Sequence, residues 1–291
     1  MVNAASDTAP QPKPRLSQFA ALWSLQGYPT AKSEWSLERK FAAIAEAGFA
    51  GICAGVDPAV HGPLIEKHGM RLLSIFNIQA KTQVRPQVRQ QAEAGAEKIV
   101  IHLAQPTTPV EKAAALFARL VDEGAKYDIP VFLETHRATC TESPERFLAI
   151  AAAYRKLTGE DLPVNWDHSH LAVVQHLYPE SWDSKLLQPR KLHQISPMAH
   201  LRPFTGHHVQ IPITHEKGKP TPEYVQWLDF AERYFSLWLE GPRPGNELCV
   251  VPELGPKNSG YPLMSFPDIW QDVLVCQQGI EKAWRKALKS A

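Results

Sequence analysis

Short apolar runs rich in β-branched residues alternate along the chain with longer amphipathic stretches. Continuous short runs are typical of buried strands, and a repeat of apolar residues every three or four positions is typical of helices. The predicted strands are Phe19–Leu25, Gly51–Val56, Arg71–Ile78, Lys98–Ala104, Pro130–His136, Pro163–Asp167, His207–Ile213 and Leu248–Leu254. The predicted helices include Leu37–Ala47, Pro109–Lys126, Pro144–Leu157, Glu223–Leu239 and Phe266–Leu288.

Signals for helix ends support this alternation. Ser36 precedes the first predicted helix and Gly48 follows it, and Ser143 stands before a proline at the first position of another. Serine before a helix caps free backbone N–H groups, and proline is favoured at the first helical position. The pattern therefore predicts regular strand–helix units.

Eight such units, with no sign of a second domain, favour a single closed (β/α)8 TIM barrel. The domain is expected to span residues 17–291, after a flexible N-terminal tail of residues 1–16 that is rich in alanine, proline and polar residues. The irregular segment Leu171–Leu201 weakens the sixth unit and leaves an open, doubly wound sheet as the alternative.

Charge and composition narrow the function class. The 291 residues carry 31 basic and 30 acidic side chains without a basic stripe, so no nucleic-acid or anionic-membrane partner is expected. No apolar run approaches the roughly 18 residues of a membrane span. The four cysteines are scattered without a CxxC pair, which predicts reduced thiols and a cytoplasmic location.

Polar residues end four successive predicted strands. Glu134 ends the fifth strand, Asp167 the sixth and Glu253 the eighth, and Gln210 lies on the seventh. TIM barrels place their active sites at the carboxyl ends of the strands. Each residue alone is explained as a solvated rim residue, but the set is expected to converge.

Three converging carboxylates raise each other's pKa unless a cation compensates their charge. A divalent metal removes this conflict, and oxygen ligands suit Mg²⁺ or Mn²⁺, with Co²⁺ or Zn²⁺ as further choices. The alternative is that these residues lie at the rim of the barrel and bind no metal.

These residues resemble a family, the xylose-isomerase-like sugar phosphate isomerase/epimerase barrels, nearest the hydroxypyruvate isomerase branch. The sequence His208-Val209-Gln210-Ile211, followed by His215-Glu216-Lys217-Gly218, is similar to the HVQI strand and HEPG-like loop of that branch. Asp167 and His170 resemble its Asp-x-x-His motif. The continuations after Glu134 and Glu253 differ from those of the branch, which leaves the substrate open.

The resemblance implies that one divalent metal is bound by Glu134, Asp167, Gln210 and Glu253. Epimerase relatives have histidine as the seventh-strand ligand, so His208 competes with Gln210 for that position. We prefer Gln210 as the ligand and His208 as a substrate contact, with both side chains on one face of the predicted strand.

The chemistry expected of such a site is proton transfer through a metal-stabilised enediolate. Glu134 and Glu253 are expected to act as base and acid. The histidines expected to bind the substrate are His102, His136, His170 and His208. Arg202, in His200-Leu201-Arg202 before the predicted seventh strand, is either a cation for an acidic substrate or a surface residue.

The resulting prediction is an isomerase or epimerase that acts on a small sugar or hydroxy-keto acid. A homodimer is a possible assembly. A metal-dependent lyase, dehydratase or hydrolase with the same site is the alternative, because such reactions begin with the same proton abstraction. A non-enzymatic binding protein is the third class. A DNA-repair endonuclease of related fold is disfavoured, since it needs more histidine ligands and a basic face.

Overall fold

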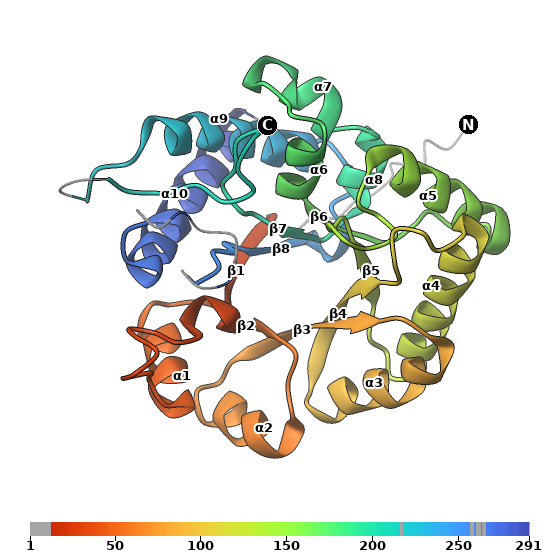
Figure 1. Cartoon of the computed structure of the whole chain (residues 1–291), viewed down its shortest axis with the longest axis horizontal. Helices are drawn as coiled ribbons and strands as arrows, with labels where there is room; N and C mark the ends of the chain where they lie inside the picture. Colours follow the sequence, from red (N-terminus) through yellow and green to blue (C-terminus); the bar gives the residue numbers. More distant parts are fainter. Residues whose placement is uncertain (1–12, 216–217, 257–258, 260–262, 264–265, 291) are drawn as a thin grey trace, which may run out of the picture.

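Eight parallel strands close into a barrel in the computed structural model, which describes residues 13–215, 218–256, 259, 263 and 266–290 (Figure 1). Each strand pairs with the next, and β8 returns to β1. The strands are β1 (Arg15–Ala21), β2 (Gly51–Ala54), β3 (Arg71–Ile78), β4 (Ala96–Leu103), β5 (Val131–Glu134), β6 (Val164–Asp167), β7 (Met198–His200) and β8 (Glu247–Val251). The predicted TIM barrel is confirmed, and the open sheet is excluded.

The helices form a ring around the barrel (Figure 1). They are α1 (Leu37–Glu46), α2 (Pro58–Lys67), α3 (Lys81–Glu93), α4 (Val110–Ala125), α5 (Pro144–Thr158), α6 (His168–Val174), α7 (Trp182–Leu186), α8 (Arg190–Ile195), α9 (Pro222–Leu239) and α10 (Ile269–Ser290). The capping signals act as expected: Ser36 accepts a hydrogen bond from the Arg39 N–H and Ser143 accepts one from the Arg146 N–H. The irregular sixth unit contains three short helices, α6 to α8.

The prediction for the seventh strand is wrong. β7 is Met198–His200, and residues 207–213 follow it as a loop without strand structure. Ile211 and Ile213 are buried in this loop, and the Ile213 N–H donates to Asp272 of α10 instead of a neighbouring strand. The apolar pattern that suggested a strand therefore comes from a loop packed into the core.

Smaller differences occur at the start of the chain. Residues 22–25, predicted as strand, form the short 3-10 helix η1 (Leu22–Leu25). β1 begins at Arg15, two residues before the predicted domain boundary, and the rest of the predicted tail, residues 1–12, lies outside the described residues.

Two apolar layers hold the barrel together. Inside it, a cluster that includes Phe19, Leu73, Val100, Phe132 and Met198 fills the space between the strands. A larger cluster lies between the outer faces of the strands and the helices. The interior below the strand ends is thus packed, and the carboxyl ends of the strands carry the polar groups.

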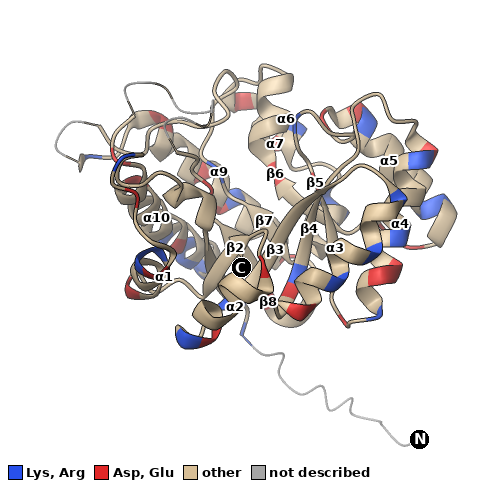
Figure 2. Ribbon diagram, turned by 60° about the horizontal axis from the view of Figure 1, so that its bottom comes forward, with Lys and Arg blue, Asp and Glu red and all other residues tan. Residues whose placement is uncertain are grey.

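The surface of the ring carries mixed charge. Basic and acidic residues alternate along the outer helices α3 to α5 (Figure 2). The cysteines are free and buried. Within the part of the chain that the structure describes, no helix is both long and apolar enough to cross a membrane.

Glu247 joins the first and last strands at the amino-terminal end of the barrel. Its carboxylate accepts hydrogen bonds from Arg71 Nη1 and Nη2 at 2.7 and 3.0 Å and from the Ser17 hydroxyl. Burial raises the pKa of Glu247, but the hydrogen bonds from Arg71 and Ser17 outweigh this effect and lower it from 4.5 to about 2.

A lowered pKa in the folded state adds stability above the unfolded-state value, and this stability is lost as the pH falls towards the folded-state value. We expect Glu247→Gln to lower the free energy of unfolding by about 2 kcal/mol at pH 7. The difference from wild type should shrink between about pH 4.5 and pH 2. Urea unfolding at several pH values measures it, and a difference independent of pH would contradict this role.

Candidate active site

A cavity of about 620 Å³ opens at the carboxyl ends of the strands. Its polar wall carries His102, His136, His200, Arg202 and Glu253. The rest of the lining is largely apolar, comes from η1, α1 and the ends of β1 to β3, and includes the polar residues Gln26, Lys40 and Asn77. A concave site with an apolar side and a few converging polar groups is typical of a small-molecule site.

The polar wall follows from the two-residue repeat of the strands. Inward-facing residues recur at every second position, so a polar residue two places beyond an apolar one lies directly above it. On four strands, an apolar residue of the barrel core is followed two positions later by a polar residue at the cavity. The pairs are Val100 and His102, Phe132 and Glu134, Met198 and His200, and Val251 and Glu253.

His200 lies between two glutamates. Its Nδ1 is 3.2 Å from Glu134 Oε2 and 3.0 Å from Glu253 Oε2. Its Nε2 faces the Cys53 thiol, 3.8 Å from Sγ. Glu134, Asp167, His200 and Glu253, from four successive strands, are called the β5–β8 cluster below.

Asp167 serves both a helix and the cluster. Its Oδ1 accepts hydrogen bonds from the backbone N–H and the hydroxyl of Ser169, so Asp167 caps the start of α6. Its Oδ2 is 3.4 Å from His170 Nε2 and 3.5 Å from Arg202 Nη2. Because one oxygen is used by the helix, only the other is presented to the cluster.

Neighbouring polar residues hold the carboxylates in place. Asn165 Nδ2 donates to Glu134 Oε2 at 3.1 Å. Thr135 Oγ1 bonds both the carbonyl and the N–H of Asp167 at 3.0 Å, which ties the ends of β5 and β6 together. Side chains held in this way need little reorganisation on binding.

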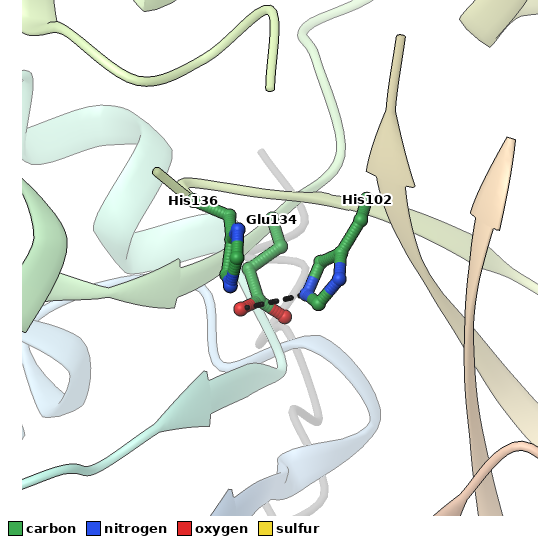
Figure 3. A group of neighbouring side chains, drawn as sticks. All are labelled: His102, Glu134 and His136. Atoms are coloured by element: carbon green, nitrogen blue, oxygen red, sulfur yellow. Dashed lines mark ion pairs between the residues drawn. The ribbon is translucent and has the colours of Figure 1, made fainter. Parts of the chain in front are cut away.

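Three imidazoles lie beside Glu134. His102 Nε2 is 3.2 Å from Glu134 Oε1, and in the view of Figure 3 the carboxylate lies between the rings of His136 and His102. The rings of His102 and His136 stack with centroids 3.9 Å apart, and His170 follows at 4.2 Å from His136.

Charge compensation decides the protonation of these groups. Burial raises the pKa of Glu134 and of Glu253, but neighbouring groups lower it more. The imidazoles of His200 and His102 act on Glu134, and Arg202 and His200 bring the pKa of Glu253 to about 2. Burial lowers the pKa of His200, yet the two glutamates raise it well above its usual value. Two acids thus share the charge of one imidazolium.

The pKa values of Asp167 and of two histidines are instead shifted so that the neutral form is favoured. Burial raises the pKa of Asp167 to about 6, only partly opposed by Arg202. Burial together with nearby histidines lowers the pKa of His136 to about 4, and that of His170 well below its usual value. At neutral pH both imidazoles are neutral.

The β5–β8 cluster fits a divalent cation. Three of its buried atoms have no hydrogen-bond partner among the described residues: Asp167 Oδ2, His200 Nδ1 and Glu253 Oε2. Glu134 turns Oε2, which accepts from Asn165, towards His200, and its Oε1 faces His102. Buried polar atoms are normally satisfied, so each such atom needs an explanation. Three carboxylate oxygens and one imidazole nitrogen form a donor set suited to Mn²⁺ and related cations.

Gln210 uses its side-chain amide for hydrogen bonds to the backbone. Its side-chain Nε2 donates to the Gly255 carbonyl at 3.1 Å, and its Oε1 accepts from the Gly255 N–H at 2.7 Å. Both ends of the amide are therefore used to join the loop after β7 to the loop after β8, two residues beyond Glu253.

His208 also lies elsewhere. It is exposed, hydrogen-bonded to Thr205, and lines a separate cavity of about 390 Å³ that it shares with His170. Within the resembling loop, Glu216 and Lys217 lie outside the described residues.

His200 and Arg202 were underestimated from the sequence. Arg202, considered there as a possible surface residue, is only 2% exposed and lies 2.7 Å from Glu253 Oε2. The signal for His200 was the sequence Met198-Ala199-His200, which repeats the spacing of Phe132-Leu133-Glu134. Three residues are too short a strand for periodicity to reveal.

Comparisons with known proteins identify the fold. No family model matches the chain, and no curated protein matches it. D-allulose 3-epimerase from Methylomonas sp. shares 16% identity at a TM-score of 0.59, covering 94% of this chain and 98% of that chain. 3-keto-D-glucoside 4-epimerase from E. coli shares 13% identity at a TM-score of 0.53, covering 92% of this chain and 100% of that chain.

A probable 3-DHS dehydratase from Bacillus anthracis is also similar, at 14% identity and a TM-score of 0.52, covering 94% of this chain and 98% of that chain. At such identities the likeness concerns the fold. The predicted TIM-barrel fold is confirmed, whereas membership of the xylose-isomerase-like family and of its hydroxypyruvate isomerase branch stays a prediction.

The contacts of Gln210 give a test of its role. Gln210→Ala removes two buried hydrogen bonds and leaves Gly255 unsatisfied, so we expect a loss of about 2 kcal/mol in the free energy of unfolding. His208→Ala, at an exposed position, is the control and should be nearly neutral. Urea unfolding measures both. Unchanged stability together with loss of bound Mn²⁺ would instead restore Gln210 as a ligand.

Proposed function

We propose that this protein is a divalent-metal-dependent isomerase or epimerase that acts on a small sugar or hydroxy-keto acid by proton transfer. The observation that carries the proposal is the β5–β8 cluster, in which Asp167, His200 and Glu253 are grouped around Glu134 and each keep a buried atom without a hydrogen-bond partner among the described residues. The structural neighbours named as epimerases support the reaction class.

The residues that would hold the metal are Glu134, Asp167, His200 and Glu253. His200 replaces Gln210 in the predicted set, because its Nδ1 lies against both glutamates while the Gln210 amide is bonded to Gly255. A bound divalent cation would polarise the carbonyl and hydroxyl oxygens of the substrate and stabilise developing negative charge.

Glu253 and Glu134 are the proposed proton carriers. Glu253 lines the cavity and has direct access to a substrate carbon. Glu134 lies deeper, behind His102 and His136. Moving a proton to the neighbouring carbon gives isomerisation, and returning it to the opposite face of the same carbon gives epimerisation.

The remaining polar residues would bind and orient the substrate. His102 and His136 line the cavity as neighbours of Glu134, and Arg202 presents a buried cation beside Glu253. His170 packs behind His136, where it supports that ring. We retain His208 only for a substrate that extends into the second cavity.

A dehydratase is the second candidate function, favoured by the neighbour named as a probable dehydratase. It would use the same proton abstraction, followed by loss of a hydroxyl group as water. Product analysis separates the two reactions: solvent deuterium in an intact carbon skeleton indicates an isomerase or epimerase, and loss of water indicates a dehydratase.

Neutralising either glutamate should remove activity. We expect Glu134→Gln and Glu253→Gln each to lower kcat by about 100-fold or more. Deuterium incorporation from D₂O into ketohexoses, 3-keto-glucosides and hydroxy-keto acids, measured by NMR with Mn²⁺ present, checks this. Glu247→Gln is the matched control, because that glutamate begins β8, at the opposite end of the barrel from Glu253, which follows the last residue of the strand by two positions. Full activity in either site variant would rule out the two-carboxylate mechanism.

Cys53 should orient His200. With Nδ1 turned to the cluster, Nε2 carries the proton and donates to the Cys53 thiol. Cys53→Ala should therefore weaken Mn²⁺ binding about tenfold. Cys249→Ala, another buried thiol of the barrel interior, is the control. Equal Mn²⁺ affinities in calorimetric titrations of the two variants would show that the thiol does not orient the ring.

A further inference from the structure

Glu134 faces two different sets of donor atoms. Its Oε2 lies against His200 within the β5–β8 cluster, and its Oε1 lies 3.2 Å from His102 Nε2 on the other side. His102, Glu134 and His136 each offer one atom within 4.8 Å of the others, a grouping separate from Glu134, His200 and Glu253 (Figure 3). The carboxylate is therefore placed between two possible cation sites.

We infer that His102, Glu134 and His136 form a second metal site, adjacent to the first and joined to it through the Glu134 carboxylate. Two imidazoles and one carboxylate form the ligand set typical of zinc sites that keep an open position. The second site is richer in nitrogen than the β5–β8 cluster, so it should prefer Zn²⁺ or Co²⁺ where the first prefers Mn²⁺ or Mg²⁺.

The free atoms of these residues support a cation. Glu134 is only 1% exposed, and neither its Oε1 nor His102 Nε2 has a hydrogen-bond partner among the described residues. The two atoms form an ion pair with each other at 3.2 Å, which leaves the remaining hydrogen-bonding capacity of the buried carboxylate oxygen unused. A cation between them would use this capacity.

His136 is anchored in the way a metal ligand requires. Its Nδ1 lies 2.6 Å from the carbonyl oxygen of Arg137, which can only accept, so Nδ1 donates and Nε2 keeps its lone pair. Metal-binding histidines commonly fix their free nitrogen on a backbone carbonyl, which sets the tautomer and the ring orientation. The anchor is built into the loop directly after β5.

The second site would also face the substrate. His102 and His136 line the 620 Å³ cavity, whereas Glu134 lies behind them. An open coordination position would therefore point into the cavity and bind a substrate oxygen. This inference rests on the proposed function for the first site, but it changes the role of Glu134 from proton carrier to shared ligand and leaves Glu253 as the proton carrier.

Metal stoichiometry tests the inference without any substrate. The full-length protein is stripped with a chelator, loaded with Zn²⁺ or Mn²⁺, and its bound metal per chain is counted by native mass spectrometry. We expect two equivalents in the wild type and one in His136→Ala. His102→Gln, which keeps more of the side-chain volume, should also bind one equivalent. Thermal unfolding of each variant verifies that the barrel is intact.

His200→Ala should remove the other equivalent, and His208→Ala, in the separate cavity, should retain both. With Mn²⁺ in both sites, electron paramagnetic resonance should show an exchange-coupled signal that reverts to that of isolated Mn²⁺ in His136→Ala. Neither readout depends on turnover.

The outcomes separate the two proposals. A single equivalent that is lost in His200→Ala and kept in His136→Ala overturns the second site and leaves the proposed function standing. A single equivalent lost in His136→Ala and kept in His200→Ala supports the second site and contradicts the first. A wild-type protein that binds no metal overturns both.

Discussion

Repulsion between carboxylates is the constraint on which the site depends. A closed parallel barrel brings the ends of β5 to β8 to one rim, and these ends place Glu134, Asp167 and Glu253 near one another in a buried environment. Without a compensating cation such groups cannot all be ionised. His200 and Arg202 supply positive charge within the chain, and the donor atoms left without hydrogen bonds are where a metal ion would add more.

The barrel interior positions this charge. Apolar residues such as Phe132 and Met198 pack below, and the next inward position on the same strands carries Glu134 and His200. A packed layer directly beneath charged groups excludes water from that side and limits movement of the strand ends. The proposed chemistry would therefore take place on a packed base, and the loops above it would determine which substrate enters.

Much of the architecture was predictable because a barrel repeats a simple pattern. The alternation of apolar runs and amphipathic stretches was sufficient for the barrel, and the strand-end position of Glu134, Asp167 and Glu253 was sufficient to bring these acids together. What failed was the seventh strand. β7 has only three residues, and the buried loop after it has a stronger apolar pattern than the strand itself.

The resemblance reinforced this error. The segment from His208 to Ile211 is similar to a strand motif of the family, but in this structure it forms a loop. Burial of Arg202 could not be predicted from its neighbours in sequence, since its partners Asp167 and Glu253 come from other strands. The stacking of His102 on His136 and the anchor on Arg137 likewise depend on how β4 and β5 are placed in space.

The two oxygens of Asp167 have separate duties, one at the start of α6 and one towards the cluster. A related chain without the proposed reaction would not need a negative charge at this position, but it would still need a helix cap. Asparagine would then be the natural replacement, because its carbonyl oxygen can still accept from Ser169. The residue found at this position in related chains would thus distinguish those that retain the chemistry from those that retain only the barrel.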